Sequence, residues 1–173
     1  MGLTPPARLV LSPPVAGGYT KASVEPAALT FLMGKFPAVL PGDCRYARNH
    51  MWCREAEGRQ RFGFTAYAVR LMQDVYFLDW QVSPGAEVPL LGQIGHIETS
   101  KAVADLFAPV SGTMTMFNQD LLNDPSPINL DNYGAGWLFD MATDGAATMT
   151  AGEYYQFLDA NWETTQRLLK GHM

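Results

Sequence analysis

A single lysine, Lys101, stands at the tip of what the sequence predicts to be a β-hairpin. Thr99 and Ser100 precede it and Ala102 follows it, so that small or polar residues form the turn. An exposed amine on a rigid turn suits covalent attachment of a cofactor, and the reaction chemistry would then belong to the cofactor. On this pattern alone, a lysine in such a turn is usually an ordinary surface residue. Apolar residues on both sides of the tip would anchor the hairpin in a sheet: Ile94, Ile97, Val103, Leu106 and Phe107.

The segment that must position this hairpin, residues 43–148, consists of short β-like runs separated by turn residues. Thr65 is a suitable N-cap for a short helix over 66–72, with Arg70 exposed. Turns are expected at 55–58 and 83–86, and a loop at 123–127. Many short strands at close spacing indicate a sandwich or a small barrel. The expected strands are 45–54, 60–65, 75–80, 90–98, 102–108, 113–117 and 137–141.

The two ends of the chain differ from this central segment. Residues 1–42 are rich in proline and glycine, which predicts little regular structure in the first 24 residues and a short helix over 26–36. Residues 149–173 contain the clearest helix, over 150–170, in which Thr150 and Glu153 have the spacing of a capping box. We therefore expect three parts: an N-terminal extension, a carrier domain over 43–148 and a C-terminal helix packed on that domain.

Composition excludes several classes of function. The net charge of −5 argues against a general nucleic-acid binder, which would need a basic face. No apolar run approaches the roughly 20 residues of a membrane helix, and the N-terminus lacks a signal-peptide pattern, so we expect a cytoplasmic protein. Cys44 and Cys53 fit neither a redox pair nor a zinc ribbon, so no metal site is predicted. We find no catalytic triad, phosphate loop or metalloprotease motif, and therefore predict no catalytic residues.

The residues around the lysine form a wider frame. Glu98 lies three positions before Lys101, Gly112 eleven after it and Gly85 sixteen before it. With the segments 97–102, 108–112 and 133–138, this frame resembles the H protein of the glycine cleavage system, a lipoyl carrier. The resemblance runs from about residue 46 to residue 137. Further matching positions are Tyr46, His50, Trp52, Gly63, Phe64, Thr65, Tyr67, Ala68, Asp74, Asn118, Pro127 and Asn129.

The resemblance implies a mainly β fold, a flattened β-barrel or sandwich of the lipoyl-domain (barrel-sandwich hybrid) type with a C-terminal helix and short additional helices. It implies lipoate attached covalently to Lys101, with attachment dependent on the residues Glu98, Ser100, Ala102, Gly85 and Gly112. His50 and Asp105 are candidates for a groove that shelters the arm. The implied partners are glycine decarboxylase, aminomethyltransferase, dihydrolipoamide dehydrogenase and the lipoate-attaching enzymes. Gly112 is expected to have a positive φ that presents the hairpin.

The chain departs from the family pattern in places. Met51 stands where an acidic residue is usual, and Gln73 where a glycine precedes Asp74. These departures and the extended termini leave open an H-like lipoate-binding protein of another pathway, such as sulfur oxidation or a lipoate relay. An unmodified interaction module is the alternative from a different class. A biotin carrier is disfavoured because Ser100 and Ala102, rather than two methionines, flank the lysine.

Overall fold

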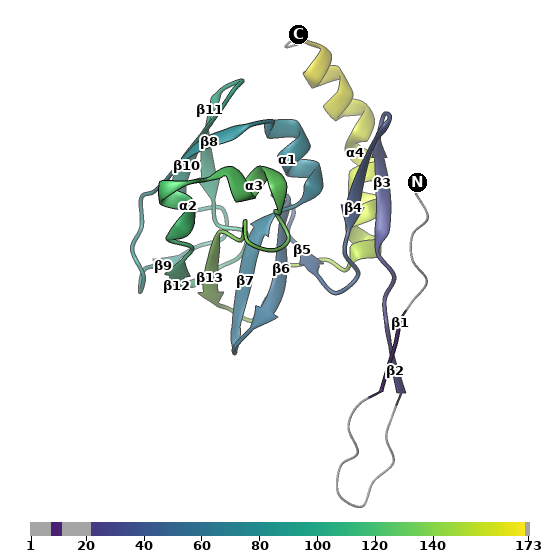
Figure 1. Cartoon of the computed structure of the whole chain (residues 1–173), viewed down its shortest axis with the longest axis horizontal. Helices are drawn as coiled ribbons and strands as arrows, with labels where there is room; N and C mark the ends of the chain where they lie inside the picture. Colours follow the sequence, from purple (N-terminus) through teal and green to yellow (C-terminus); the bar gives the residue numbers. More distant parts are fainter. Residues whose placement is uncertain (1–7, 12–21, 172–173) are drawn as a thin grey trace, which may run out of the picture.

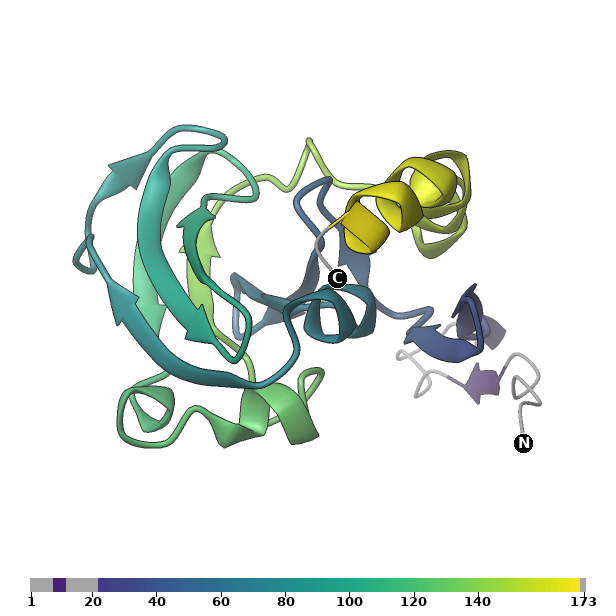
Figure 2. The same ribbon diagram turned by 90° about the horizontal axis from the view of Figure 1, so that it is seen from above.

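The computed structural model describes residues 8–11 and 22–171. Two antiparallel sheets face each other in the central part of the chain, which is called the domain below (Figures 1 and 2). The larger sheet has the order β5-β6-β7-β13-β12-β9, and the smaller has the order β11-β10-β8. The prediction of a mainly β, sandwich-like fold is therefore confirmed. The strands are β5 (Arg45–Tyr46), β6 (Met51–Ala56), β7 (Arg59–Phe64), β8 (Val75–Trp80), β9 (Glu87–Val88), β10 (Gln93–Thr99), β11 (Val103–Phe107), β12 (Gly112–Phe117) and β13 (Phe139–Ala142).

The space between the two sheets holds the main hydrophobic core. The rings of Phe62 and Phe139 stack at 5.4 Å between centroids, on neighbouring strands of the larger sheet. Leu78, Ile94 and Ile97 contribute from the smaller sheet, and all five side chains are buried. Alternate residues of a strand point to opposite faces, so β10 can bury Ile97 while Glu98 stays partly exposed. This anchoring gives the lysine hairpin a rigid base.

Short helices connect the strands. α1 (Ala66–Met72) begins at Thr65, whose hydroxyl accepts the Ala68 N–H at 3.1 Å as predicted. α2 (Asp120–Asn123) and α3 (Ser126–Leu130) lie between β12 and β13, so the loop predicted over 123–127 is confirmed only at residues 124–125, and its ends belong to the two helices. Asp124 accepts the Ser126 N–H at 3.1 Å, and a proline in the first turn favours the start of α3.

The C-terminal helix, α4 (Ala151–Gly171), begins at the predicted capping box. Thr150 N–H donates to Glu153 Oε1 at 2.8 Å, and Glu153 N–H donates to Thr150 Oγ1 at 3.2 Å. These reciprocal bonds satisfy donors that a helix start leaves unpaired. Across residues 8–11 and 22–171, no helix is long and apolar enough to cross a membrane.

The N-terminal extension is more ordered than predicted. The expected helix over 26–36 is wrong, because β3 (Leu29–Met33) and β4 (Phe36–Leu40) form a hairpin that turns at Gly34, with φ +64°. Phe31 is buried while Leu32 is 60% exposed, so an apolar residue on the solvent side concealed the strand alternation. β1 (Arg8–Leu11) and β2 (Ala22–Glu25) also pair, against the expectation of little regular structure there. Residues 1–7 and 12–21 of that prediction lie outside the described residues.

A second core joins this hairpin to α1 and α4. The Phe31 ring meets Tyr67 of α1 and Trp162 of α4 edge-on, with centroids 6.0 and 5.8 Å away. Tyr46 and Tyr154 stack at 4.7 Å with nearly parallel planes. These contacts pack α4 and the β3–β4 hairpin side by side along one flank of the domain (Figure 1). The β3–β4 hairpin and α4 therefore both lie next to α1.

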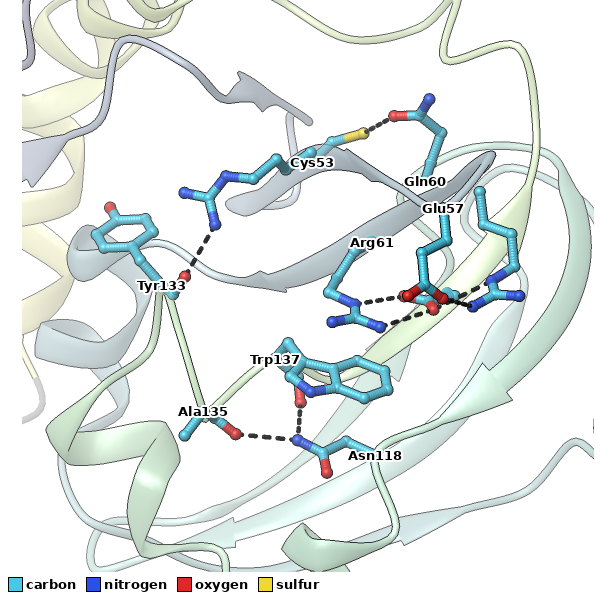
Figure 3. Close-up of polar contacts among 11 residues, drawn as sticks. Cys53, Glu57, Gln60, Arg61, Asn118, Tyr133, Ala135 and Trp137 are labelled. Carbon is cyan, nitrogen blue, oxygen red and sulfur yellow. Dashed lines mark hydrogen bonds and ion pairs between the residues drawn. The ribbon is translucent and has the colours of Figure 1, made fainter.

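The segment that leads into β13 is held by side-chain clamps (Figure 3). The Asn118 amide donates to the carbonyls of Ala135 and Trp137 at 3.0 and 2.8 Å. The Arg61 guanidinium lies 3.8 Å from the centre of the Trp137 ring and donates to the buried Asp140 carboxylate at 2.9 Å. β13 begins at Phe139, directly after the clamped segment and two residues later than predicted.

Candidate functional site: the Lys101 hairpin

Thr99 holds the tip of the hairpin together. Its side chain is buried, and its hydroxyl accepts the N–H groups of Lys101 and Ala102 at 3.1 and 3.2 Å. The same hydroxyl and the Thr99 N–H both donate to the Ala102 carbonyl, at 3.2 and 2.9 Å. A threonine bonded in this way fixes the turn through its own side chain. The backbone of Lys101 is thus positioned while its side chain stays exposed.

A second contact ties the tip to the rest of the domain. Ser100 N–H donates to the carbonyl of Asp74 at 3.1 Å, at the junction between α1 and β8. The preceding residue, Gln73, ends α1 with φ +60° and ψ −152°, a region that glycine populates far more readily than other residues. The departure from the family glycine therefore falls at a strained position. The segment Gln73–Asp74 lies directly against the lysine tip.

Glu98 lies on the outer face of the smaller sheet, beside the tip. It pairs across the strands with Val103 and Phe77. One of its oxygens lies 4.0 Å from His96 Nε2, and Asp79 Oδ2 lies 3.9 Å from His96 Nδ1. The face next to the lysine therefore carries carboxylates together with the exposed apolar side chains of Phe77 and Val103. Such a mixed surface suits recognition by another protein.

A cavity opens directly at the lysine. This lysine vestibule, of about 520 Å³, is bounded by Lys101 itself, by the end of β10 and the turn after it, and by side chains from α1, β11 and α4: Leu71, Met72, Thr99, Ala102, Ala104 and Leu169. A further cavity of about 190 Å³, the His50 pocket, shares Leu71, Met72 and Ala104 with the vestibule. His50 and Asp105 both line this pocket. The structure thus brings these two predicted groove residues together and connects them to the lysine.

His50 sits at a bend that splits the predicted strand 45–54 into β5 and β6. Its φ is +70°, and its N–H donates to the Ala47 carbonyl at 3.1 Å. Its Nδ1 lies 2.9 Å from the Tyr154 hydroxyl, and its ring is tilted against Tyr67 at 4.8 Å. Burial lowers the pKa of His50 from its ordinary value of 6.5 to about 4. The pocket lining therefore includes a neutral imidazole at pH 7 and one carboxylate, that of Asp105.

This low pKa gives a pH-dependent stability. Since the unfolded chain takes up a proton on His50 below about pH 6.5 and the folded chain only near pH 4, stability is lost as the pH falls through this window. We expect a loss of up to about 3 kcal/mol from this group. Urea unfolding from pH 7.5 to 3.5 would measure it. Carboxylates titrate in the same range, so His50→Asn, which tolerates the positive φ, is the control. An equally steep profile in that variant would contradict the assignment.

The two framing glycines lie away from the tip. Gly85 has φ +95° and its N–H donates to the Met114 carbonyl, as a turn glycine should. Gly112 begins β12 and pairs with Val88 of β9, at the end of the domain away from the lysine hairpin (Figure 1). The expected positive φ at Gly112 is wrong. Glycine is needed there because a Cβ would stand 2.5 Å from the Ala142 carbonyl oxygen.

The two thiols are both buried and free. Cys53 Sγ donates to Gln60 Oε1 at 3.0 Å (Figure 3), and Cys44 Sγ accepts from Arg54 at 3.1 Å. Burial raises the pKa of Cys53 to about 11 and that of Cys44 to about 12. Both are protonated at neutral pH and therefore weak nucleophiles.

Sequence reasoning missed several parts of the site. The side chains that line the pockets from α1, Leu71 and Met72, carry only the signal of a short amphipathic helix. Tyr154, which bonds both His50 and Thr65, comes from a helix 104 residues along the chain from His50. No local pattern could connect these residues, because they meet only through the tertiary fold.

Comparison with known proteins agrees with this geometry. A family model described as "Glycine cleavage H-protein" matches residues 44–160. The glycine cleavage system H protein of Mycobacterium avium is 39% identical over 111 residues, covering 64% of this chain and 83% of that protein. The Mycobacterium leprae protein is 41% identical over 103 residues, 59% of this chain and 77% of that one. The crystal structure of the Mycobacterium marinum H protein has a TM-score of 0.59 and 32% identity, covering 70% of this chain and 99% of that chain.

Proposed function

The chain belongs to the glycine cleavage H-protein family, and from this premise we propose that it carries lipoate as an amide on Lys101. Its function is that of the carrier protein of a glycine cleavage system. The observation that carries the proposed attachment site is the tip itself. The lysine is exposed, and its turn is held by a hydrogen bond to the Thr99 hydroxyl and by one from Ser100 N–H to the Asp74 carbonyl. The amine is accessible while its backbone is fixed, as a modifying enzyme requires.

The bound group would supply a dithiolane that accepts the aminomethyl unit of glycine and is later reoxidised. The chain contributes the attachment point, the docking surface and the shelter. Acylation removes the positive charge of Lys101, so the arm begins as a neutral chain at the mouth of the vestibule. An aminomethyl group adds an ammonium, which the Asp105 carboxylate at the His50 pocket would attract while apolar walls exclude water.

The partners follow from this cycle. Glycine decarboxylase, aminomethyltransferase and dihydrolipoamide dehydrogenase would each dock near the lysine tip, and a lipoate-attaching enzyme would read the same surface. The carboxylates of Glu98 and Asp79, with the exposed ring of Phe77, form the adjoining face. A tethered group replaces free diffusion between these enzymes with a high local concentration.

Intact mass measurement with peptide mapping tests the attachment site. Protein purified from lipoate-fed cells should carry one lipoyl adduct, confined to the peptide that contains Lys101. Lys101→Arg prepared in the same way should carry none. An adduct on another lysine would refute the assigned site. The absence of any adduct, in cells whose own lipoyl proteins are modified, would favour an unmodified interaction module.

A further inference from the structure

A third cavity, the helix pocket, opens beside the lysine and runs under the end of α4. It measures about 200 Å³, and Lys101 is one of its lining residues. Its apolar walls come from three elements: Met33 of β3, Leu71 of α1, and Trp162 and Leu169 of α4. Leu71 and Leu169 also line the lysine vestibule. Lys101 therefore lines two cavities: the vestibule, which shares lining residues with the His50 pocket, and the helix pocket at α4.

The helix pocket is built in part by segments of the chain that lie outside the family match. The family model matches residues 44–160, so Met33, Trp162 and Leu169 all lie outside the match. Trp162 is nevertheless firmly held, with Phe31 and Tyr67 rings edge-on at 5.8 and 6.1 Å. Ring pairs at such distances stabilise one another beyond simple burial. The added elements thus place a fixed apolar wall beside the modified residue.

The two pockets differ in charge. Arg70 lines the helix pocket, and its guanidinium lies 4.5 Å from the centre of the Phe36 ring of β4. Apart from Lys101, whose charge acylation would remove, Arg70 is the one charged residue in the described lining. Asp105 lines the His50 pocket, whose described lining has no lysine or arginine. A neutral apolar group is therefore suited to the helix pocket, whereas a cationic group is suited to the His50 pocket.

We propose that the helix pocket binds the uncharged dithiolane of the chain's own lipoyl arm. The inference rests on the proposed attachment at Lys101. The arm is the expected occupant because its attachment point, Lys101, is itself one of the residues that line the pocket. When the arm carries an ammonium, Arg70 repels it and the arm leaves for the His50 pocket. The segments outside the family match would thus give the uncharged arm a binding pocket different from the one that binds the ammonium-bearing arm.

Methyl NMR of protein with a mass-verified adduct tests the binding. The methyl signals of Met33 and Leu169 should shift in the oxidised lipoyl form relative to the unmodified protein. The same signals should return toward their unmodified positions after the arm is reduced and both thiols are alkylated with 2-bromoethylamine, which displaces bromide and leaves one ammonium on each sulfur substituent. In Arg70→Glu, the ammonium-bearing arm should stay and the shifts should persist. Unshifted methyls in the oxidised wild-type form would overturn the proposal.

Chemical protection gives an independent readout. If the arm occupies the pocket about 80% of the time, reduction of the dithiolane by a water-soluble phosphine should be about fivefold slower than for a free arm. Leu169→Glu places a charge in the pocket and should abolish this protection. Leu168→Glu is the matched control, because Leu168 is 62% exposed and does not line the pocket, and it should retain the wild-type rate. Equal rates in the wild type and Leu169→Glu would overturn the proposal.

The two proposals fail in different ways. Without an adduct on Lys101, the proposed attachment falls and the pocket assignment falls with it. With an adduct on Lys101 but unshifted methyls and an unprotected dithiolane, only the pocket assignment falls. Cys44 and Cys53 do not confuse the alkylation, because both are buried and protonated at neutral pH.

Discussion

Replacing Lys101 with arginine is expected to reduce glycine turnover by a reconstituted cleavage system to the level measured without this protein. Arginine keeps the positive charge and most of the length of the side chain, but its guanidinium is not acylated by lipoate-attaching enzymes. Lys101 is exposed, and the tip is held by Thr99 and by backbone bonds, so the fold should be unchanged. Release of labelled carbon dioxide from glycine would measure turnover, and thermal unfolding would report the fold.

The matched control is Lys35→Arg. Lys35 is an exposed lysine on the turn between β3 and β4, and the same exchange there should leave turnover at the wild-type level. Turnover above background with Lys101→Arg would contradict the attachment site. Loss of turnover in both variants would point to a general effect of arginine on the preparation rather than on the arm.

Replacing Gly112 with valine should destabilise the whole domain. A Cβ at this position would meet the Ala142 carbonyl oxygen at 2.5 Å and Thr143 Cβ at 3.0 Å, so β12 and β13 would have to separate. Overpacking of this kind costs about 1–3 kcal/mol, and occasionally more. Urea unfolding would measure the loss. Lipoylation in cells should fall by the same factor as the folded population.

Substitutions at two other glycines distinguish the destabilisation caused by steric crowding from that caused by an unfavourable backbone conformation. At Gly152 an added Cβ meets no atom within 4 Å, so Gly152→Ala should not destabilise the protein. Gly85 has open space but a φ of +95°, so Gly85→Ala should cost on the order of 1 kcal/mol through the backbone alone. If folded Gly112→Val were lipoylated more slowly than folded wild type, Gly112 would act on hairpin presentation, contrary to its position away from the tip.

The sequence was informative where one strong local signal decides the structure. The lysine turn, the N-cap at Thr65 and the capping box at Thr150 all depend on residues within a few positions of each other. The family resemblance and the mainly β fold are confirmed by the family match and by the sheets. The assignments of Lys101, Glu98, Ser100, Ala102, Gly85, His50 and Asp105 as attachment or groove residues stay predictions.

The errors occurred where long-range packing decides. The segment 29–40 carries apolar residues on both faces, so its period cannot distinguish a helix from a hairpin. Contact with α1 and α4 selects the hairpin. At Gly112 the sequence showed that glycine is needed, but the reason lies in a carbonyl on β13, thirty residues further along the chain. No local pattern reports such an approach.

Two sets of hydrogen bonds hold the lysine tip in place and thereby fix the point from which the lipoyl arm would reach other enzymes. Thr99 fixes the turn from within and Asp74 holds it from the side, so the base of the arm is a stationary pivot. A tethered group explores a volume that grows with every freedom of its base, and its local concentration falls in proportion. A mobile tip would lower the local concentration of the reactive sulfurs at each docked enzyme. Two hydrogen-bonded anchors therefore act as a concentrating device, although neither touches the chemistry.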